Sequence, residues 1–261
     1  MELFSIEQQR ACAGIGLVDL WGVLMTVGFQ AFTDTGLYQI DGQTPNLQCT
    51  QSMAAVSSQQ AVNIGNTAQG PYYVTKWVST FTFGGTTPIY AIATDGGVGA
   101  TVWDHQLSSG IHTVRVITDS QVMVRFFVFD QVPPASSNFG LQVFDANGKL
   151  IADSSRAFFR VLDVVHDQYL SGTGWVVGGF PSYGPFSRSY GGRPVLIACP
   201  YGCHTWMDYS GGSDVGLTMF QVSGDTVSWY QHNWASPTPN WAGFRETFHC
   251  HFMVIDGTGL L

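Results

Sequence analysis

Short segments in which polar and apolar residues alternate run through most of the chain. Thr75–Phe83 alternates for most of its length, and Val98–Val102, Thr113–Ile117 and Gln121–Phe129 are short runs rich in β-branched and aromatic residues. Gly, Pro, Asn and Asp separate these runs, which is typical of strands joined by tight turns. No segment keeps a 3.6-residue apolar period for more than about three turns. We therefore expect an all-β protein, with Ser5–Ala13 as the best helix candidate.

One hairpin pattern occurs twice. Gly28–Asp41 recurs as Gly140–Asp153, at an offset of 140 − 28 = 112 residues. Both copies read G-h-Q-h-F-x-x-[TN]-G-x-[YL]-x-x-D, where h is apolar. An apolar strand enters a turn whose Gly supplies the positive φ, and a second strand returns. Since two such hairpins share the same Gln, Phe, Gly and Asp, the pattern indicates internal duplication.

Two further motifs follow in the same order in each half. A Gly-Gly segment ending in Pro precedes an apolar run, and a strand of the form h-V-h-D comes last. These motifs are Gly84–Pro88 with Ile89–Ala93 and Gly191–Pro194 with Val195–Ala198, followed by Phe126–Asp130 and Phe252–Asp256. The stretch Pro133–Ser137 reads Pro-Pro-Ala-Ser-Ser, which is typical of a stiff, exposed joint.

We therefore predict two tandem related domains. Residues 1–21 form an N-terminal arm, 22–132 a first β-domain, and 138–261 a second β-domain with aromatic-rich loops. Each half holds several short strands with turn signals at close spacing, and neither holds the crossover helices that a parallel sheet needs. The pattern favours antiparallel β-sandwich-like domains.

The second hairpin resembles a small domain of tail proteins from long-tailed bacteriophages. The resemblance rests on FGLQVFDANGKLIADSS at 139–155, on Phe159–Asp163, and on Phe252–Gly259, which is similar to a closing F-x-V-I-D-x-T-G strand. The first half departs from it, because Thr33–Thr35 replaces the Asp-x-Asn turn and Gly42–Leu47 lacks an Arg-Val-Leu-Asp line. The resemblance implies a virion component of the tail, baseplate or tail fibre, and it implies no functional residue.

Composition and charge limit the classes of partner that the chain is expected to bind. Charged residues make up 11% of the chain, against a usual share of about 25%. Such a surface is expected either where neighbouring subunits cover it or where Ser, Thr, Gln and Asn replace charges. With a net charge of −8 and no basic cluster, we expect neither nucleic acid nor anionic membrane as a partner.

Targeting signals are not evident in the sequence. No apolar stretch reaches the ~20 residues of a membrane span, and the acidic start lacks the basic region of a secretory signal. Five scattered cysteines do not form a dense disulfide pattern. We expect a chain made in the host cytoplasm, without membrane insertion, that ends in a virion tail.

Aromatic residues gather in the second half. The segment Ser228–Trp241 mixes Trp229, Tyr230, Trp234 and Trp241 with amides and two prolines. Exposed Trp and Tyr rings give rigid contact area, which suits protein or sugar partners. We expect this segment to project as a loop and to bind a partner; the alternative is that its rings fill the core.

A metal site is the less favoured interpretation of a second cluster. Cys199, Cys203, His249 and His251 carry the thiolates and imidazoles that Zn²⁺ prefers. Their spacing matches no standard finger, and Cys199 and Cys250 are expected in the core of adjacent strands. We expect no catalytic residues, no cofactor and no metal.

The sequence thus favours a non-enzymatic structural protein of a phage tail. Its expected partners are other virion tail subunits, a host surface receptor or glycan, and further copies of itself in a homo-oligomer. One alternative is a receptor- or carbohydrate-binding module, and a less favoured one is a metal-dependent hydrolase.

Overall fold

The computed structural model describes residues 31–32, 38–40, 46–67, 70–131, 140–168, 186–201, 204–209, 212–235, 242–243 and 249–261. Within these ranges every element is a β-strand, apart from one 3₁₀ turn, η1 (Asp95–Gly97). The predicted all-β class is confirmed. The expected arm and the helix candidate Ser5–Ala13 lie outside the described residues.

The strands of the first half are β1 (Ala31–Phe32), β2 (Tyr38–Ile40), β3 (Leu47–Val56), β4 (Ser58–Thr67), β5 (Gly70–Gly84), β6 (Ile89–Thr94), β7 (Ala100–Ser108), β8 (Ile111–Thr118) and β9 (Met123–Gln131). Those of the second half are β10 (Gln142–Phe144), β11 (Leu150–Asp153), β12 (Val161–Gln168), β13 (Phe186–Ser189), β14 (Val195–Tyr201), β15 (His204–Tyr209), β16 (Gly212–Ser223), β17 (Thr226–Ala235), β18 (Ala242–Gly243) and β19 (His249–Asp256).

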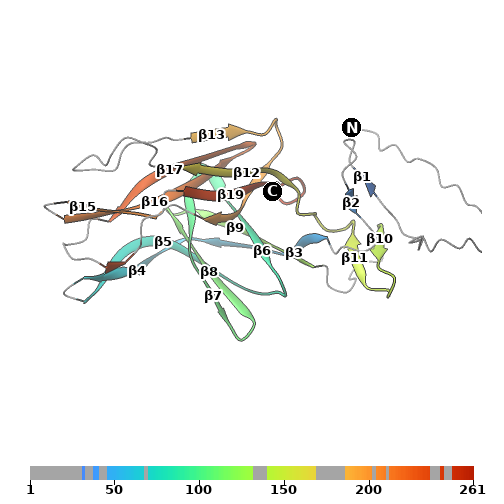
Figure 1. The fold of residues 1–261 in the computed structure, drawn as a ribbon, viewed down its shortest axis with the longest axis horizontal. Helices are drawn as coiled ribbons and strands as arrows, with labels where there is room; N and C mark the ends of the chain where they lie inside the picture. The colour runs from blue at the N-terminus through green and yellow to red at the C-terminus, as the bar shows by residue number, and fades with distance from the viewer. Residues whose placement is uncertain are drawn as a thin grey trace, which may run out of the picture.

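Two antiparallel sheets pack on each other (Figure 1). The six-stranded sheet has the order β12-β19-β14-β6-β9-β3. The nine-stranded sheet has the order β13-β17-β16-β7-β8-β5-β4-β18, with β15 paired to β16 beside this path. The β1–β2 and β10–β11 hairpins each form a two-stranded sheet of their own. The arrangement is a β-sandwich with two additional hairpins.

Strand pairing in the first half recurs in the second. The order β6-β9-β3 corresponds to β14-β19-β12, and β5-β8-β7 corresponds to β13-β17-β16. The two halves meet where equivalent strands pair, β6 with β14 and β7 with β16. Each sheet therefore has equivalent strands at matching distances from its junction, as a pseudo-twofold axis requires.

The hairpins repeat even in their irregularities. In β1–β2 the register shifts between Ala31 and Phe32, and in β10–β11 it shifts between Val143 and Phe144, 112 residues later. The bulge of β3 after Cys49 recurs in β12 after Val161, at the same offset. Because β-bulges re-aim a strand at a defined position, this agreement extends the sequence repeat to the backbone.

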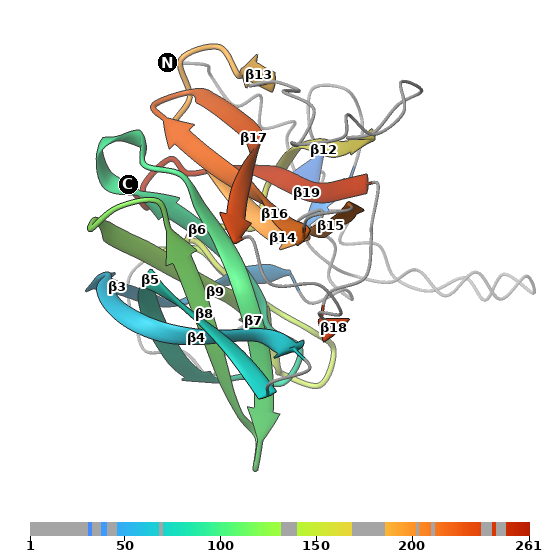
Figure 2. The same ribbon diagram turned by 90° about the vertical axis from the view of Figure 1, so that its left-hand side faces the viewer.

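Two separate domains are not confirmed. Each large sheet contains strands from both halves, as the mixed blue-green and orange-red strands of Figure 2 show. The predicted joint Pro133–Ser137 lies outside the described residues. The repeated motifs lie in equivalent strands of the two halves, but the β6–β14 and β7–β16 pairs join these halves into shared sheets.

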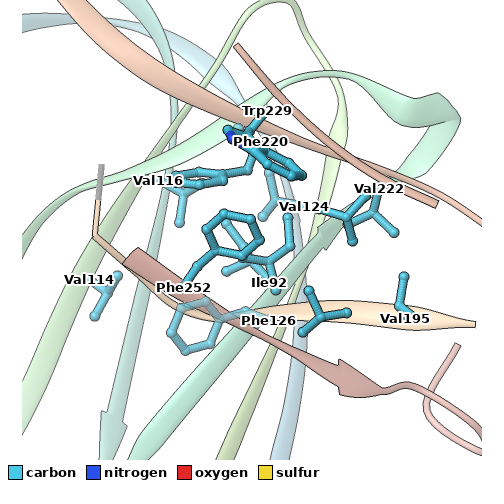
Figure 3. Packing of buried hydrophobic residues seen from close by; sticks show 14 of the residues in the cluster. Ile92, Val114, Val116, Val124, Phe126, Val195, Phe220, Val222, Trp229 and Phe252 are labelled. Atoms are coloured by element: carbon cyan, nitrogen blue, oxygen red, sulfur yellow. The ribbon is translucent and has the colours of Figure 1, made fainter. Parts of the chain in front are cut away.

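One core fills the space between the two sheets (Figure 3). Phe126 of β9 and its counterpart Phe252 of β19 are 0% and 2% exposed, and both belong to this cluster. Phe126 stacks on Phe81, with ring centroids 4.5 Å apart, and Phe252 meets Phe220 edge to face at 5.0 Å. Each of these aromatic pairs lies within one half, but the buried cluster to which they belong contains residues of both halves, so its burial stabilises the two halves together.

The six-stranded sheet curves until its outer strands meet. Phe158, just before β12, bridges Gln48 of β3, and the Phe159 N–H donates to the Leu47 carbonyl at 2.9 Å. On the sheet face away from the main core, a second apolar cluster that includes Phe127 and Leu196 is fully buried. The closed curvature explains how both faces of this sheet are shielded from water.

The nine-stranded sheet curls as well. Val62 and Ile64 of β4 pack with Leu217 and Met219 of β16, although three strands separate β4 from β16 in the sheet. The sheet is therefore concave on the face turned away from the main core. This concave face holds the polar pocket described next.

Candidate interaction sites

Trp229 is a core residue. The segment Ser228–Ala235 belongs to strand β17 and is not a projecting loop, so this part of the prediction is wrong. The Trp229 ring is 2% exposed, stacks on Phe186 at 5.7 Å and meets Phe252 edge to face at 5.3 Å. Because side chains alternate across a strand, every second residue from Trp229 shares its inward face. Trp229 cannot offer its ring to a partner while the sandwich is intact.

Tyr230 points to the opposite face. Its hydroxyl donates a hydrogen bond to the carboxylate of Asp119, which follows β8 in the first half. Burial and this hydrogen bond raise the pKa of Tyr230. The ring also packs against the apolar cluster of the concave face. Partner binding by Tyr230 stays a prediction, as it does for the Trp234 side chain and for Trp241, which lie outside the described residues.

A polar pocket opens beside this hydrogen bond. It has a volume of about 170 Å³, and its titratable side chains are Lys76, Asp119 and His232. The His232 Nδ1 lies 3.8 Å from Asp119 Oδ1. Burial lowers the pKa of Lys76, and the nearby Asp119 carboxylate opposes this shift. The remaining lining residues are Thr75, Trp77, Ile117, Thr118 and Met219.

The pocket joins residues that are far apart in the sequence. Asp119 comes from the first half and His232 from the second. Beside the pocket, Asp119 meets the Tyr230 hydroxyl above Gly99, where a side chain would clash with both groups. The Lys76 ammonium, the Asp119 carboxylate and the His232 imidazole of the pocket can bind a small polar group. Sequence reasoning missed this site, because no local motif connects the two chain segments.

Gly99→Ala is expected to lower the free energy of unfolding by about 1–2 kcal/mol, because the added methyl group displaces the Tyr230 hydroxyl from the charged Asp119. Tyr230→Phe should cost a similar amount, and the double variant little more than either alone, since both remove one interaction. Urea denaturation provides the measurement. Gly84→Ala is the matched control, because no atom in the described part of the chain lies within 4 Å of its added carbon. Additive costs in the double variant would contradict this assignment.

The residues of the predicted metal alternative separate into different environments. Cys250 is 0% exposed in the main core, as expected, whereas Cys199 is exposed at an irregular end of β14 with a φ of 46°, so its predicted core position is wrong. His251 is exposed, and its ring lies 4.2 Å from that of His166. Cys203 and the His249 side chain lie outside the described residues. Within the described part, no three His, Cys, Asp or Glu side chains are grouped to hold a metal ion.

A second histidine pair lies at one end of the sandwich. His105 Nε2 and His112 Nδ1 are 2.8 Å apart and share a hydrogen bond. Burial, followed by the neighbouring His112, lowers the pKa of His105, while Asp104 raises it. The sequence carried a signal for this pair: the two histidines flank the tight turn Ser109–Gly110, so hairpin pairing brings them to one face.

Comparisons with protein-family models, with curated proteins and with solved structures find no match for this chain. The resemblance to phage tail domains therefore rests on the short motifs alone. The described residues include no helix with the length and apolar character of a membrane span.

Proposed function

We propose that the chain is a non-enzymatic structural component of a phage tail that assembles with other virion subunits. The segment that carries the resemblance also exposes large apolar side chains. Leu141 and Phe144 of the β10–β11 hairpin are 51% and 50% exposed, and Val161 and Val164 of β12 are 45% and 66% exposed. These are four of the nine large apolar side chains that are exposed among the described residues, and exposed apolar side chains favour a protein contact.

The fold supports a role in assembly. The low share of charged residues suits a surface that neighbouring subunits cover. The β10–β11 hairpin is not part of either large sheet, and it docks through hydrogen bonds of its second strand on the start of β3 in the other half. Its exposed side, with Leu141 and Phe144, would dock on a neighbouring subunit in the same way.

The test uses purified particles of the phage that encodes the chain. We expect mass spectrometry to find the chain in intact virions at a fixed copy number, and antibody labelling to place it on the tail. A Leu141→Asp, Phe144→Asp double variant should fold but no longer enter particles. Val56→Asp is the matched control, because Val56 is 52% exposed outside this segment.

A receptor- or carbohydrate-binding module that acts outside a particle is the alternative. In that case the chain would be absent from intact virions, monomeric in the lysate, and indifferent to the double variant. Those results would reject the structural role, and the Lys76–Asp119–His232 pocket would become the first place to search for a ligand.

A further inference from the structure

The polar pocket on the concave face of the nine-stranded sheet lies where the two halves meet. Lys76 of β5 and Asp119, which follows β8, belong to the first half, and His232 of β17 belongs to the second. Strands β7 and β16 connect these elements within one sheet. Because side chains on paired strands keep fixed positions, the sheet itself holds the three groups around the pocket.

A gap separates the Asp119 carboxylate from the His232 imidazole. His232 Nδ1 lies 3.8 Å from Asp119 Oδ1, which is longer than a hydrogen bond of about 2.7–3.2 Å. The other carboxylate oxygen, Oδ2, accepts the hydrogen bond from the Tyr230 hydroxyl. That bond fixes the carboxylate with Oδ1 on the side of His232. A ligand hydroxyl can lie within hydrogen-bond distance of both atoms, since a hydroxyl donates and accepts at once.

The pocket has a polar side that solvent reaches and an apolar side that is buried. The His232 side chain is 45% exposed and that of Asp119 is 26% exposed, so a ligand can approach both from solvent. Ile117 and Met219 line the same pocket and are each 1% exposed. The combination suits a ligand that carries hydroxyl groups on a compact carbon ring.

The charges of the pocket favour a neutral ligand. Lys76 attracts an anion that Asp119 repels, and the reverse holds for a cation. A neutral ligand with several hydroxyl groups meets both, because each hydroxyl can accept from the ammonium or donate to the carboxylate. The volume of about 170 Å³ lies below the roughly 300–1,000 Å³ of pockets for drug-sized ligands. The pocket therefore suits a single small ring.

We propose that this pocket binds one neutral sugar residue, either a free monosaccharide or a unit of a glycan. Asp119 Oδ1 accepts a hydrogen bond from a ring hydroxyl, His232 Nδ1 bonds to the same hydroxyl, and Lys76 donates to a neighbouring one. The carbon face of the ring lies toward Ile117 and Met219. The site goes beyond the proposed role in a tail, because it needs no contact with other virion subunits. The virion test and a test of sugar binding can therefore fail separately.

The test is saturation-transfer difference nuclear magnetic resonance on the full chain with three probes: methyl glucoside, methyl galactoside and N-acetylglucosamine. We expect at least one probe to receive saturation from the protein. His232→Ala and Lys76→Gln should each weaken its binding about tenfold, as expected for the loss of one strong hydrogen bond. Lys149→Gln is the matched control, because Lys149 is the only other lysine of the chain and is exposed on the β10–β11 hairpin. An array of neutral glycans then separates the sources, since a free-sugar site leaves the array empty and a glycan site does not.

Three outcomes would overturn the proposal. The first is that neither a probe at millimolar concentration nor a neutral glycan binds. The second is that only acetate, glycine or acidic glycans bind, and the third is that Lys149→Gln reduces sugar binding as much as the pocket variants do. If a variant fails to fold, the wild-type chain still decides the question. The bound probe should shift the ring signals of His232 and leave those of His251 unchanged, and the reverse would reject the site.

Discussion

Replacing Trp229 with alanine is expected to lower the free energy of unfolding by about 3–5 kcal/mol. The ring is 2% exposed and touches residues of both sheets, Phe186 on β13 and Phe252 on β19. The Arg188 guanidinium lies over the ring, 5.7 Å from its centroid. Figure 3 shows Trp229 beside Phe220 above Phe252, so truncation leaves a cavity at the centre of the core. Urea denaturation followed by circular dichroism measures the loss.

Trp229→Phe is the informative control. The indole Nε1 is buried and has no hydrogen-bond partner among the residues that the structure describes, so phenylalanine removes an unsatisfied donor while it keeps most of the ring contacts. We expect a cost below about 1.5 kcal/mol. If Trp229→Ala instead unfolded at the wild-type urea concentration and lost only particle assembly, the ring would belong to an interface and the core assignment would be rejected.

Strand content could be predicted because it is a local property. The alternating run Thr75–Phe83 lies within β5, Thr113–Ile117 lies within β8, and most of Gln121–Phe129 lies in β9. Alternation encodes which residues face a core, and tight-turn residues encode where strands end. Neither signal depends on distant parts of the chain.

The joining of the two halves could not be predicted in this way. Nothing in Ile89–Ala93 or Val195–Ala198 indicates whether these apolar runs lie at sheet edges or pair with each other. The structure pairs Ile92 with Ile197 and Ala91 with Ala198. The repeat predicted equivalent strands correctly, but a choice between separate and merged copies depends on contacts more than 100 residues apart in the chain.

The interpretation of the aromatic segment failed for a different reason. Composition suggested a polar-aromatic surface, but alternation along Ser228–His232 sends Trp229 inward and Tyr230 outward. Aromatic and polar side chains of one strand can therefore lie on opposite faces, some in the core and others at the surface. Period-two analysis applied to this segment, in place of its composition, would have separated the core residue from the candidate site.

Gln48→Leu is expected to cost about 2–4 kcal/mol, because it removes the side chain that joins the β10–β11 hairpin to the first half. Gln48 is fully buried. Its Oε1 accepts the Asp153 N–H at 2.7 Å, and its Nε2 donates to the carbonyls of Asp153 and Arg156. Leucine would remove all three bonds, although the Asp153 carbonyl would keep the hydrogen bond that it accepts from the Arg156 N–H. Gln51→Leu is the matched control on the same strand, since its amide makes one exposed bond to the Gly84 carbonyl.

Gln48→Glu tests the same contact through pH. A carboxylate still accepts the Asp153 N–H, but it cannot donate to two carbonyls and its charge is fully buried. The folded state therefore raises the pKa of Glu at position 48 above its unfolded value of about 4.3 and binds more protons than the unfolded state. Stability must then fall as pH rises through this window, so the deficit relative to wild type should shrink between pH 8 and pH 5. A deficit that is the same at both pH values, measured by urea denaturation, would show that the side chain is hydrated at position 48 and that the hairpin docks without it.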